Sequence, residues 1–333
     1  MTPRTEAARK FLLVSLSLFL IAVPAIFPAK VPSDRLTPRY AGFADIDPSK
    51  TRACLVGDTQ QTAFWEFWRE RNNPERKLVL RAILSRDPAF VINLGDLTVW
   101  GSSAAHWREF DLNHRLFRER RIPYFPILGN HEFYGDNKTA LANYFDRFPH
   151  LEGRHFYSFT WNRIAFILLD SKFGKMDGRE RKAQSDWYFS ELERFERDAN
   201  IDFIIACCHE APFTNNMVIE ANLVAQTEFA EPFTRFSKTA LFFSGHSHAY
   251  EKFMVREKLF IVSGGGGGPR HKLNIDPKTR RYDDLYPGGK IRFFNFCEIE
   301  RTEAGLLVKV RRLKSDGMFD VADQFMIAKR PKS

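Results

Sequence analysis

The sequence has no block of five like charges, no internal repeat and no cysteine spacing typical of a zinc knuckle. These absences argue against a polyionic tail, a repeat architecture and a small zinc-stabilised domain as the organising feature of the chain. Cysteine is scarce, with four residues in 333. Because Cys54, Cys207 and Cys208 fall within apolar runs, we expect buried thiols that pack as small apolar groups, rather than disulfides.

Charge and composition describe a basic chain that is able to form a large core. The formal net charge is +9 and the sequence pI is about 9.4, which suits anionic partners such as phosphate esters. Because the basic residues are scattered, we interpret them as a solvated surface and do not expect nucleic acid to be a partner. With 44% hydrophobic residues, including 33 phenylalanines, the chain can bury one large α/β core or two small ones.

The N-terminal segment has the pattern of a targeting sequence. Arg4, Arg9 and Lys10 precede an uncharged apolar run at Phe11–Phe27, which predicts that residues 1–29 are a signal peptide or an N-terminal membrane anchor. Positive charges that stay inside favour transfer of the remainder across the membrane. We therefore expect an exported protein, periplasmic or extracellular, that is either released or anchored to the membrane.

Composition divides the rest of the chain into three parts. Residues 30–50 contain three prolines and few apolar groups, so they are predicted to be an extended linker. Residues 51–313 alternate helix and strand patterns and are predicted to form the folded domain. Residues 314–333 are predicted to be a basic C-terminal tail.

Apolar periodicity predicts a mixed α/β fold. Helices are expected at residues 63–71, 75–86, 106–118 and 183–199, and later strands at 201–208, 240–244, 259–263, 293–299 and 306–310. Two further strands, 156–161 and 164–170, are separated by Asn162-Arg163, which is a hairpin signal. These are too many strands for one sheet, so we expect two stacked mixed sheets with helices outside.

Polar side chains follow the apolar runs at the points where predicted strands end. The combinations are Cys54–Gly57 with Asp58, Phe90–Gly95 with Asp96, Tyr124–Gly129 with Asn130, His131 and Glu132, Phe203–Cys208 with His209, and Ala240–Gly245 with His246 and His248. In open α/β sheets ligands collect beyond the carboxyl ends of strands, so these groups are expected to converge. Carboxylates, an amide and imidazoles bind divalent metals, and a shared carboxylate gives a binuclear site. Taken singly, each residue also has the ordinary explanation of a turn former or a core histidine satisfied by backbone.

In their order along the chain these motifs resemble those of the calcineurin-like metallophosphoesterases. The matching segments are Gly57-Asp58-Thr59-Gln60, Gly95-Asp96, Gly129-Asn130-His131-Glu132, His209 and Gly245-His246-Ser247-His248. The resemblance extends over roughly residues 51–270. Within the superfamily, His246–Glu251 and the stretch around Trp187 are most similar to the purple acid phosphatase branch.

The resemblance implies a four-layer αββα sandwich of two mixed sheets with flanking helices. It also implies two divalent metal ions, Mn, Fe or Zn, and hydrolysis of a small-molecule phosphate ester by in-line attack of a metal-bridging hydroxide. The implied roles are a bridging ligand (Asp96), ligands of the first ion (Asp58 and His248), ligands of the second ion (Asn130, His209 and His246), and a side chain that stabilises the transition state or protonates the leaving oxygen (His131).

The first and second motifs depart from the family pattern. Gln60 stands where most members have a ligating His, and Val99 stands where the purple acid branch has an iron-binding Tyr. A Gln side chain offers a carbonyl oxygen, which is a harder and weaker ligand than imidazole. We therefore predict that Gln60 ligates, or orients a water on, the first ion and that this site favours Mn²⁺ over Zn²⁺. A purple Fe(III)-phenolate chromophore is not expected.

A run of five glycines lies within Ser263–His271, directly after a predicted strand. One interpretation is a phosphate-binding segment, in which backbone N–H groups bind substrate together with Arg270 and His271. The other is a flexible connector, which five glycines fit as well. The run lacks the Lys and the spacing of a P-loop.

Two other functions fit the same motifs. A non-catalytic metal- or phosphate-binding relative is favoured by the altered first motif, whereas a nuclease would use the same two ions on nucleic acid. The scattered basic residues argue against the nuclease. One metal core serves monoesters, diesters and pyrophosphates, so the choice of substrate lies in loops, and residues 211–236 and 266–292 are expected to wall the pocket.

Overall fold

The computed structural model describes residues 37–64 and 66–329. The predicted signal peptide or anchor at residues 1–29 lies outside the described residues, so it stays a prediction. Within the part of the chain that is described, no helix is both long enough and apolar enough to cross a membrane.

Two six-stranded mixed sheets form the centre of the fold. Their strands are β1 (Arg52–Val56), β2 (Val91–Asn93), β3 (Tyr124–Pro126), β4 (Tyr157–Trp161), β5 (Ile164–Leu168), β6 (Phe203–Cys208), β7 (Thr239–Ser244), β8 (Tyr250–Val255), β9 (Lys258–Ser263), β10 (Asn295–Arg301), β11 (Gly305–Leu313) and β12 (Phe319–Ala328). The first sheet has the order β12-β11-β10-β1-β2-β3, and the second has the order β4-β5-β6-β7-β9-β8. In the first sheet β2 pairs in parallel with both β1 and β3. In the second sheet β5 pairs in parallel with β6, β6 with β7, and β7 with β9.

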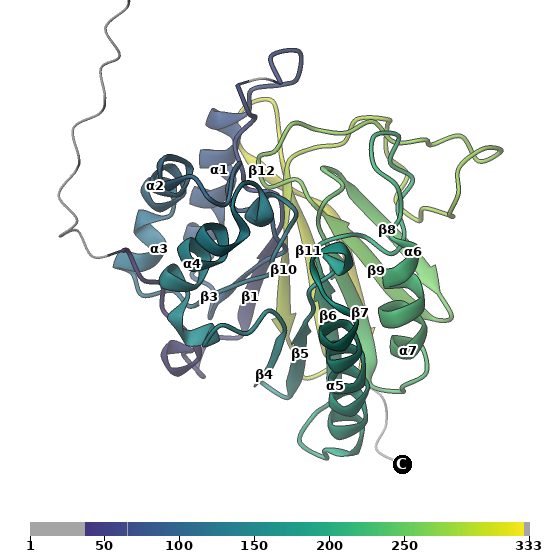
Figure 1. Ribbon diagram of the computed structural model, residues 1–333. Helices are drawn as coiled ribbons and strands as arrows, with labels where there is room; N and C mark the ends of the chain where they lie inside the picture. The colour runs from purple at the N-terminus through teal and green to yellow at the C-terminus, as the bar shows by residue number, and fades with distance from the viewer. Residues whose placement is uncertain (1–36, 65, 330–333) are drawn as a thin grey trace, which may run out of the picture. The chain divides into compact units, whose positions relative to one another are not determined.

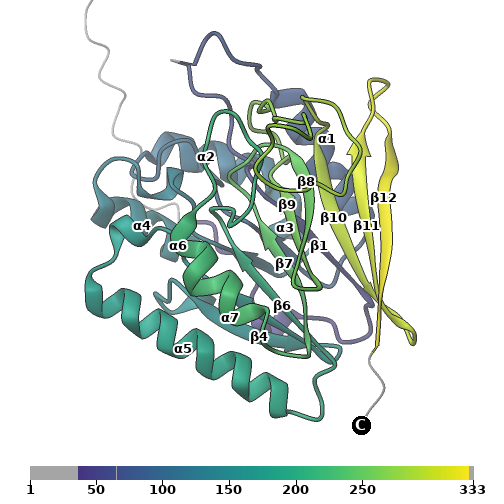
Figure 2. The same cartoon turned by 90° about the vertical axis from the view of Figure 1, so that its right-hand side faces the viewer.

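Helices cover the outer face of each sheet, as Figure 1 and Figure 2 show. The helices beside the first sheet are α1 (Asn73–Ser85), α2 (Ala104–Asn113), α3 (Arg115–Glu119) and α4 (Asn137–Arg147), and those beside the second are α5 (Gly178–Arg197), α6 (Leu223–Ala225) and α7 (Glu231–Phe233). A π-helical segment, Gln226–Ala230, connects α6 to α7. The layers therefore follow the order helix, sheet, sheet, helix, which confirms the predicted four-layer sandwich.

The side chains of β5 show how the layers are held together. Ile164, Phe166 and Leu168 lie in the core between the two sheets, whereas Ala165 and Ile167 lie in the core that includes the buried face of α5. Successive side chains of a strand point to opposite faces, so a strand that is apolar throughout contributes to two cores at once.

The β4–β5 hairpin forms where the sequence predicted it. Asn162 and Arg163 make its two-residue turn and have φ values of 47° and 63°. Positive φ at both central residues is what a type I′ turn requires, and its twist matches that of the flanking strands.

The predicted helix at residues 63–71 is wrong. The described residues of this segment form turns without a helix, and Phe64, Phe67 and Trp68 are exposed. A short helix takes most of its stability from packing of an apolar face, and here that face meets no core. The predicted helix at 106–118 is divided into α2 and α3 at His114.

The predicted linker and the predicted tail both contain parts of the folded domain. Tyr40 is 4% exposed, and its ring contacts those of Phe110 and Phe148. At the other end β12 pairs with β11 as an edge strand. Most of its residues are only partly buried, so composition gave no strand signal, and pairing with β11 decides the structure instead. The folded domain therefore includes residues 40–328, with residue 65 outside the description.

Candidate metal centre

The predicted polar residues meet at the carboxyl ends of the parallel strands of both sheets. Asp58, Asp96 and His246 each follow a glycine there, and their φ values are 60°, 56° and 63°. Left-handed backbone costs a non-glycine residue roughly 1–3 kcal/mol and is concentrated at functional sites. Strain of the same kind at three strand ends therefore marks this edge as a candidate functional site.

Asp96, His209 and His246 form one group of candidate metal ligands, whose ligand atoms lie within 4.8 Å of one another. The Nε2 atom of His209 lies 3.4 Å from Oδ1 of Asp96 and 3.1 Å from Oδ1 of Asn130. The structure thus brings together the residues that the resemblance assigns to the second ion.

Asp58, Asp96 and His248 form a second group, also within 4.8 Å. Oδ1 of Asp58 lies 3.3 Å from Nε2 of His248. Asp96 belongs to both groups, which is the position of a carboxylate shared between two ions. Both carboxylates are at most 1% exposed, and buried carboxylates need a compensating positive charge or hydrogen-bond donors.

Three imidazole rings direct their Nε2 atoms towards the cluster. Nδ1 of His209, of His248 and of His131 each lies 2.8 Å from a backbone carbonyl oxygen. The carbonyl groups belong to Leu94, Pro269 and Val99, respectively. A carbonyl oxygen only accepts, so each Nδ1 carries a proton and Nε2 is the nitrogen left to face the cluster. Metal-ligating histidines are oriented in this way.

Glu132 holds the turn that carries Asp96. Its buried carboxylate accepts the backbone N–H groups of Asp96 at 2.9 Å, of Leu97 at 2.8 Å and of Gly129 at 2.8 Å. Charge-assisted hydrogen bonds of this kind stabilise the left-handed turn. The sequence placed Glu132 beside the site without a role, and the structure shows that it positions Asp96.

The charges of the cluster interact strongly. Burial opposes ionisation of Asp96, but the imidazoles of His209 and His131 outweigh burial and hold the pKa of Asp96 below its usual value. Burial would lower the pKa of His209, yet the carboxylate of Asp96 raises it to about 10. Burial raises the pKa of Asp58, and burial together with Asp96 raises the pKa of Glu132 to about 7. Asp96 therefore favours positive charge at the centre of the cluster.

The amide of Gln60 adds an oxygen to the second group. In the orientation that satisfies both ends of the amide, Nε2 donates to the backbone carbonyl groups of Asp96 at 3.0 Å and Asp58 at 3.1 Å. Oε1 then lies 3.3 Å from Nε2 of His248, and the side chain is buried. Oxygen atoms that carry no proton and converge in a buried site are stabilised by a cation. This set of possible ligand atoms therefore fits a divalent ion.

Two glycines allow the backbone to approach the carboxylates. A Cβ atom at Gly129 would lie 2.2 Å from Oδ1 of Asp96, and one at Gly245 would lie 2.7 Å from Oδ2 of Asp58. Any side chain at either position would displace a candidate ligand, which explains the glycine in each motif.

The five-glycine run is neither a flexible connector nor an open phosphate-binding loop. Gly266 and Gly268 donate their N–H groups to the backbone carbonyl groups of Gly57 and Asp58, each at 2.9 Å. A Cβ atom at Gly268 would lie 2.6 Å from Cε1 of His248. The run is glycine-rich because it packs directly against the second ligand group.

The structure separates the two residues predicted to bind substrate. Arg270 pairs with Glu70, with 2.6 Å between Nη2 and Oε1, and does not line the cavity at the cluster. His271 lines that cavity and stacks on His248, with ring centroids 4.2 Å apart. Arg270 is therefore not placed to bind substrate, because its charge is already paired elsewhere.

The cluster opens into a cavity of about 250 Å³. It is lined by Ala63, Glu66, Arg69, Asp96, Asn130, His131, Tyr134, Val218, Ile219, His246, His248 and His271. Neither Arg69 nor Tyr134 belongs to a motif, so neither was predicted to lie at the site. Arg69 pairs with Glu66 at 2.6 Å, and the hydroxyl of Tyr134 accepts from Nδ2 of Asn130 at 2.9 Å.

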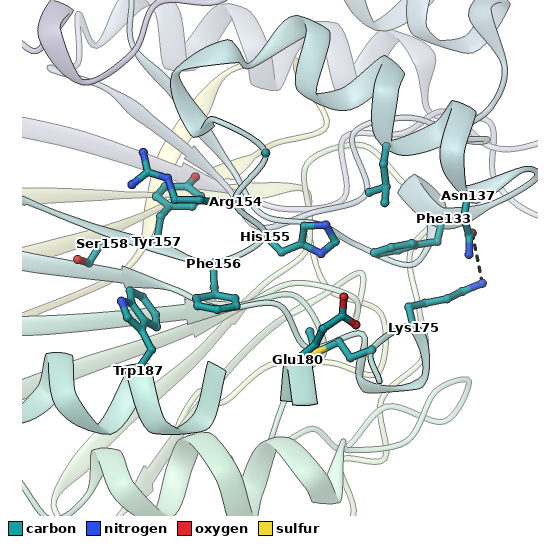
Figure 3. A pocket seen from close by; sticks show the side chains of 13 residues that line it. Phe133, Asn137, Arg154, His155, Phe156, Tyr157, Ser158, Lys175, Glu180 and Trp187 are labelled. Carbon is teal, nitrogen blue, oxygen red and sulfur yellow. Dashed lines mark hydrogen bonds between the residues drawn. The ribbon is translucent and has the colours of Figure 1, made fainter. Parts of the chain in front are cut away.

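A larger cavity, of about 660 Å³, is lined by none of the candidate metal ligands. Figure 3 shows Arg154 and Lys175 towards opposite ends of it, with His155 between them. Nδ1 of His155 lies 3.1 Å from Oδ2 of Asp170. Size alone therefore does not identify the site of the strand-end motifs.

A four-layer sandwich with a shared-carboxylate cluster at its strand ends defines the class of a candidate binuclear metalloprotein. The chain belongs to the calcineurin-like phosphoesterase family, whose model matches residues 51–250. Uncharacterized proteins of two Mycobacterium tuberculosis strains are 30% identical to it over 164 residues, which is 43% of this chain. The match spans only 30% of the length of those relatives.

Solved structures show the same fold at low sequence identity. A purple acid phosphatase from yellow lupin (Lupinus luteus) seeds has a TM-score of 0.65 at 18% identity, with 85% of this chain and 54% of that chain covered. GAP50, the anchor in the inner membrane complex of Plasmodium, has a TM-score of 0.59 at 17% identity, covering 85% and 90%. A dimetal phosphatase from Danio rerio has a TM-score of 0.55 at 12% identity, covering 85% and 100%.

Proposed function

We propose that this protein is a metal-dependent phosphoesterase that hydrolyses a phosphate ester in the cavity at Asp96. The observation that carries the proposal is the position of Asp96 in two groups of buried ligand atoms, each within 4.8 Å. Membership of the calcineurin-like phosphoesterase family supports it. Val99 supplies no phenolate, so the proposal does not include a purple iron centre.

The donor set suits two divalent ions. Asp96, Asn130, His209 and His246 would hold one, and Asp58, Gln60, Asp96 and His248 would hold the other. When bound, two such ions lower the pKa of water towards 7 and stabilise charge on the attacking and leaving oxygens. The oxygen-rich set that includes Gln60 favours Mn²⁺, and the set with two imidazoles suits Fe or Zn.

The proposed role of His131 is to protonate the leaving oxygen or to stabilise the transition state. Its Nδ1 donates to the carbonyl group of Val99, and its Nε2 lies 3.8 Å from Oδ2 of Asp96. The side chain is 19% exposed and lines the cavity. A ring held in this way presents only Nε2 to substrate, where its protonated form can donate to the leaving oxygen.

Chelation followed by metal reconstitution tests the proposal. We expect the purified protein to hydrolyse p-nitrophenyl phosphate or bis(p-nitrophenyl) phosphate, to lose that activity with a chelator and to regain it with Mn²⁺, because stabilisation of charge depends on the ions. Circular dichroism of the chelated protein checks that the fold persists. A reconstituted protein with two ions per chain and no hydrolysis of either ester contradicts the proposal.

That outcome would instead support a non-catalytic relative, the second candidate. It is favoured by Gln60 in place of the first-motif His. Among proteins of similar fold, GAP50 of Plasmodium is described as an anchor. The same assay thus decides between the two candidates.

Replacing Gln60 should change the metal preference of the second ligand group. Gln60→Ala removes the oxygen and is expected to weaken one of the two metal sites about 10–100-fold. Gln60→His supplies imidazole and is expected to raise the affinity for Zn²⁺ relative to Mn²⁺. Competition titrations with both metals, together with elemental analysis, measure the change.

Gln61→Ala is the matched control for Gln60. The amide of Gln61 contacts the carboxylate of Glu109, in the orientation that satisfies it, instead of the cluster. We expect its metal affinities to equal those of the unmodified protein. Unchanged affinities in both Gln60 variants would show that this side chain is not a ligand.

A further inference from the structure

Exposed apolar side chains are adjacent in sequence to residues that line the cavity at the metal centre. Phe64, Phe67 and Trp68, in the segment between β1 and α1, are 79%, 75% and 70% exposed. In Figure 1 this segment extends beyond the sheets as a dark purple loop at the top of the view. Large apolar groups gathered at one place on a surface mark a binding site, whereas scattered ones do not.

The same segment also belongs to the cavity. The cavity lining includes Ala63, Glu66 and Arg69, each of which is adjacent in sequence to one of the exposed aromatic residues. Arg69 donates to the carbonyl oxygen of Pro269 at 3.1 Å, and that oxygen also accepts from Nδ1 of His248 at 2.8 Å. One carbonyl group therefore ties the aromatic segment to a candidate metal ligand.

A second apolar segment lines the same cavity. Val218 and Ile219 contribute to its wall, and Met217 and Val218 are 65% and 61% exposed. Oδ1 of Asn216 accepts the N–H of Val218 at 2.7 Å, and Nδ2 of Asn216 lies 2.9 Å from Nδ1 of His271, to which it donates. Both apolar segments are thus held at the cavity by hydrogen bonds that reach the metal centre.

We propose that the substrate is a phosphate ester of a long apolar alcohol held in a lipid surface. Its phosphate enters the cavity, and the start of its apolar chain contacts Phe67, Trp68 and Val218. This inference rests on the proposed phosphoesterase function. Water attacks phosphorus, the bond from phosphorus to the ester oxygen breaks, and that oxygen takes a proton and leaves with the apolar alcohol.

The size of the cavity and the kind of residues at its mouth favour such a substrate. A cavity of about 250 Å³ accommodates a phosphate group but not a long hydrocarbon chain as well. The chain therefore stays outside, next to the exposed apolar residues and within the lipid. Trp and Phe are favoured where lipid meets water, and the net charge of +9 favours approach to an anionic surface.

The test compares lipid esters with their soluble head groups. The two p-nitrophenyl esters first establish whether monoesters or diesters are hydrolysed. If monoesters are hydrolysed, phosphatidic acid in phosphatidylcholine vesicles is then compared with glycerol 3-phosphate. If diesters are hydrolysed, phosphatidylglycerol in the same vesicles is compared with glycerophosphoglycerol. We expect kcat/KM for the lipid to be about tenfold or more above that for the soluble head group, which is the scale of discrimination by apolar contacts.

The double variant Phe67→Ser with Trp68→Ser tests the contribution of the exposed aromatic residues separately from that of the metal centre. We expect hydrolysis of the vesicle lipid to fall about tenfold. Hydrolysis of the p-nitrophenyl ester should stay within about twofold, because neither residue lines the cavity. Leu112→Ser on α2, 75% exposed and also outside the cavity lining, is the matched control and should change neither rate.

Each outcome decides a separate point. A soluble head group hydrolysed as fast as the lipid, or a vesicle rate that the double variant leaves unchanged, overturns this inference and leaves the phosphoesterase function intact. Equal rates on vesicles and on a monomeric short-chain form of the same lipid overturn the requirement for a surface. No hydrolysis of either p-nitrophenyl ester would remove the proposed function and this inference with it.

Discussion

Replacing Asp96 with alanine should remove bound metal and abolish turnover. Asp96 is the carboxylate common to both ligand groups, so its loss weakens both sites at once. A bound ion supplies several kcal/mol of charge stabilisation, and about 1.4 kcal/mol is a factor of ten, so kcat/KM should fall about 10³-fold or more. Elemental analysis per chain, beside kinetics on the p-nitrophenyl esters, measures both effects.

Two further variants keep this result interpretable. Asp96→Asn keeps the shape of the side chain and tolerates the left-handed backbone at φ 56°, and it should lose metal as well because an amide is a weaker ligand than a carboxylate. Asp316→Ala removes an exposed carboxylate that pairs with Lys314 and should change nothing. A folded Asp96→Asn protein with both ions and full activity would contradict the shared-ligand role.

Replacing His131 with alanine should keep both ions and lose turnover. His131 lines the cavity but belongs to neither group of clustered ligand atoms. A positioned general acid contributes about 10²–10⁴-fold, so kcat should fall by that factor while metal content is unchanged. The loss should be larger for an alkyl ester such as glycerol 3-phosphate than for a p-nitrophenyl ester, because nitrophenolate leaves without a proton.

His155→Ala is the matched control for His131. Its ring pairs with Asp170 at the larger cavity and should affect neither kcat nor metal content. Loss of an ion in the His131 variant would show that His131 is a ligand. An unchanged kcat with both ions present would show that His131 takes no part in the reaction.

The candidate site was predictable to the extent that it follows the strand ends. Asp58, Asp96 and His246 follow the apolar runs that contain β1, β2 and β7, respectively. The length and apolar composition of a strand are local properties, so these runs can be recognised in the sequence. The neighbouring residues Arg270 and His271 show the limit. They differ in role because Glu70, far away in the chain, pairs with Arg270 and leaves only His271 at the cavity.

The errors in the fold prediction share one physical cause. Tyr40 is in a proline-containing segment but is buried by rings from distant parts of the chain. The strand β12 has little apolar patterning of its own and forms by pairing with β11. Residues 63–71 are apolar enough for a helix, but the large apolar side chains described there, Phe64, Phe67 and Trp68, are exposed and pack in no core. In each case the presence or absence of contacts with distant residues overrides the local propensity.

The sequence by itself determined the family, the kinds of metal-binding groups and the strand ends on which they stand, because motif order and apolar runs are written along the chain. Only the tertiary structure decided that Nε2 of three imidazoles faces the cluster and that Glu132 holds the turn at Asp96. It also decided that exposed aromatic residues are adjacent in sequence to residues that line the cavity. These features depend on hydrogen bonds and burial between segments far apart in the chain, which no local pattern encodes.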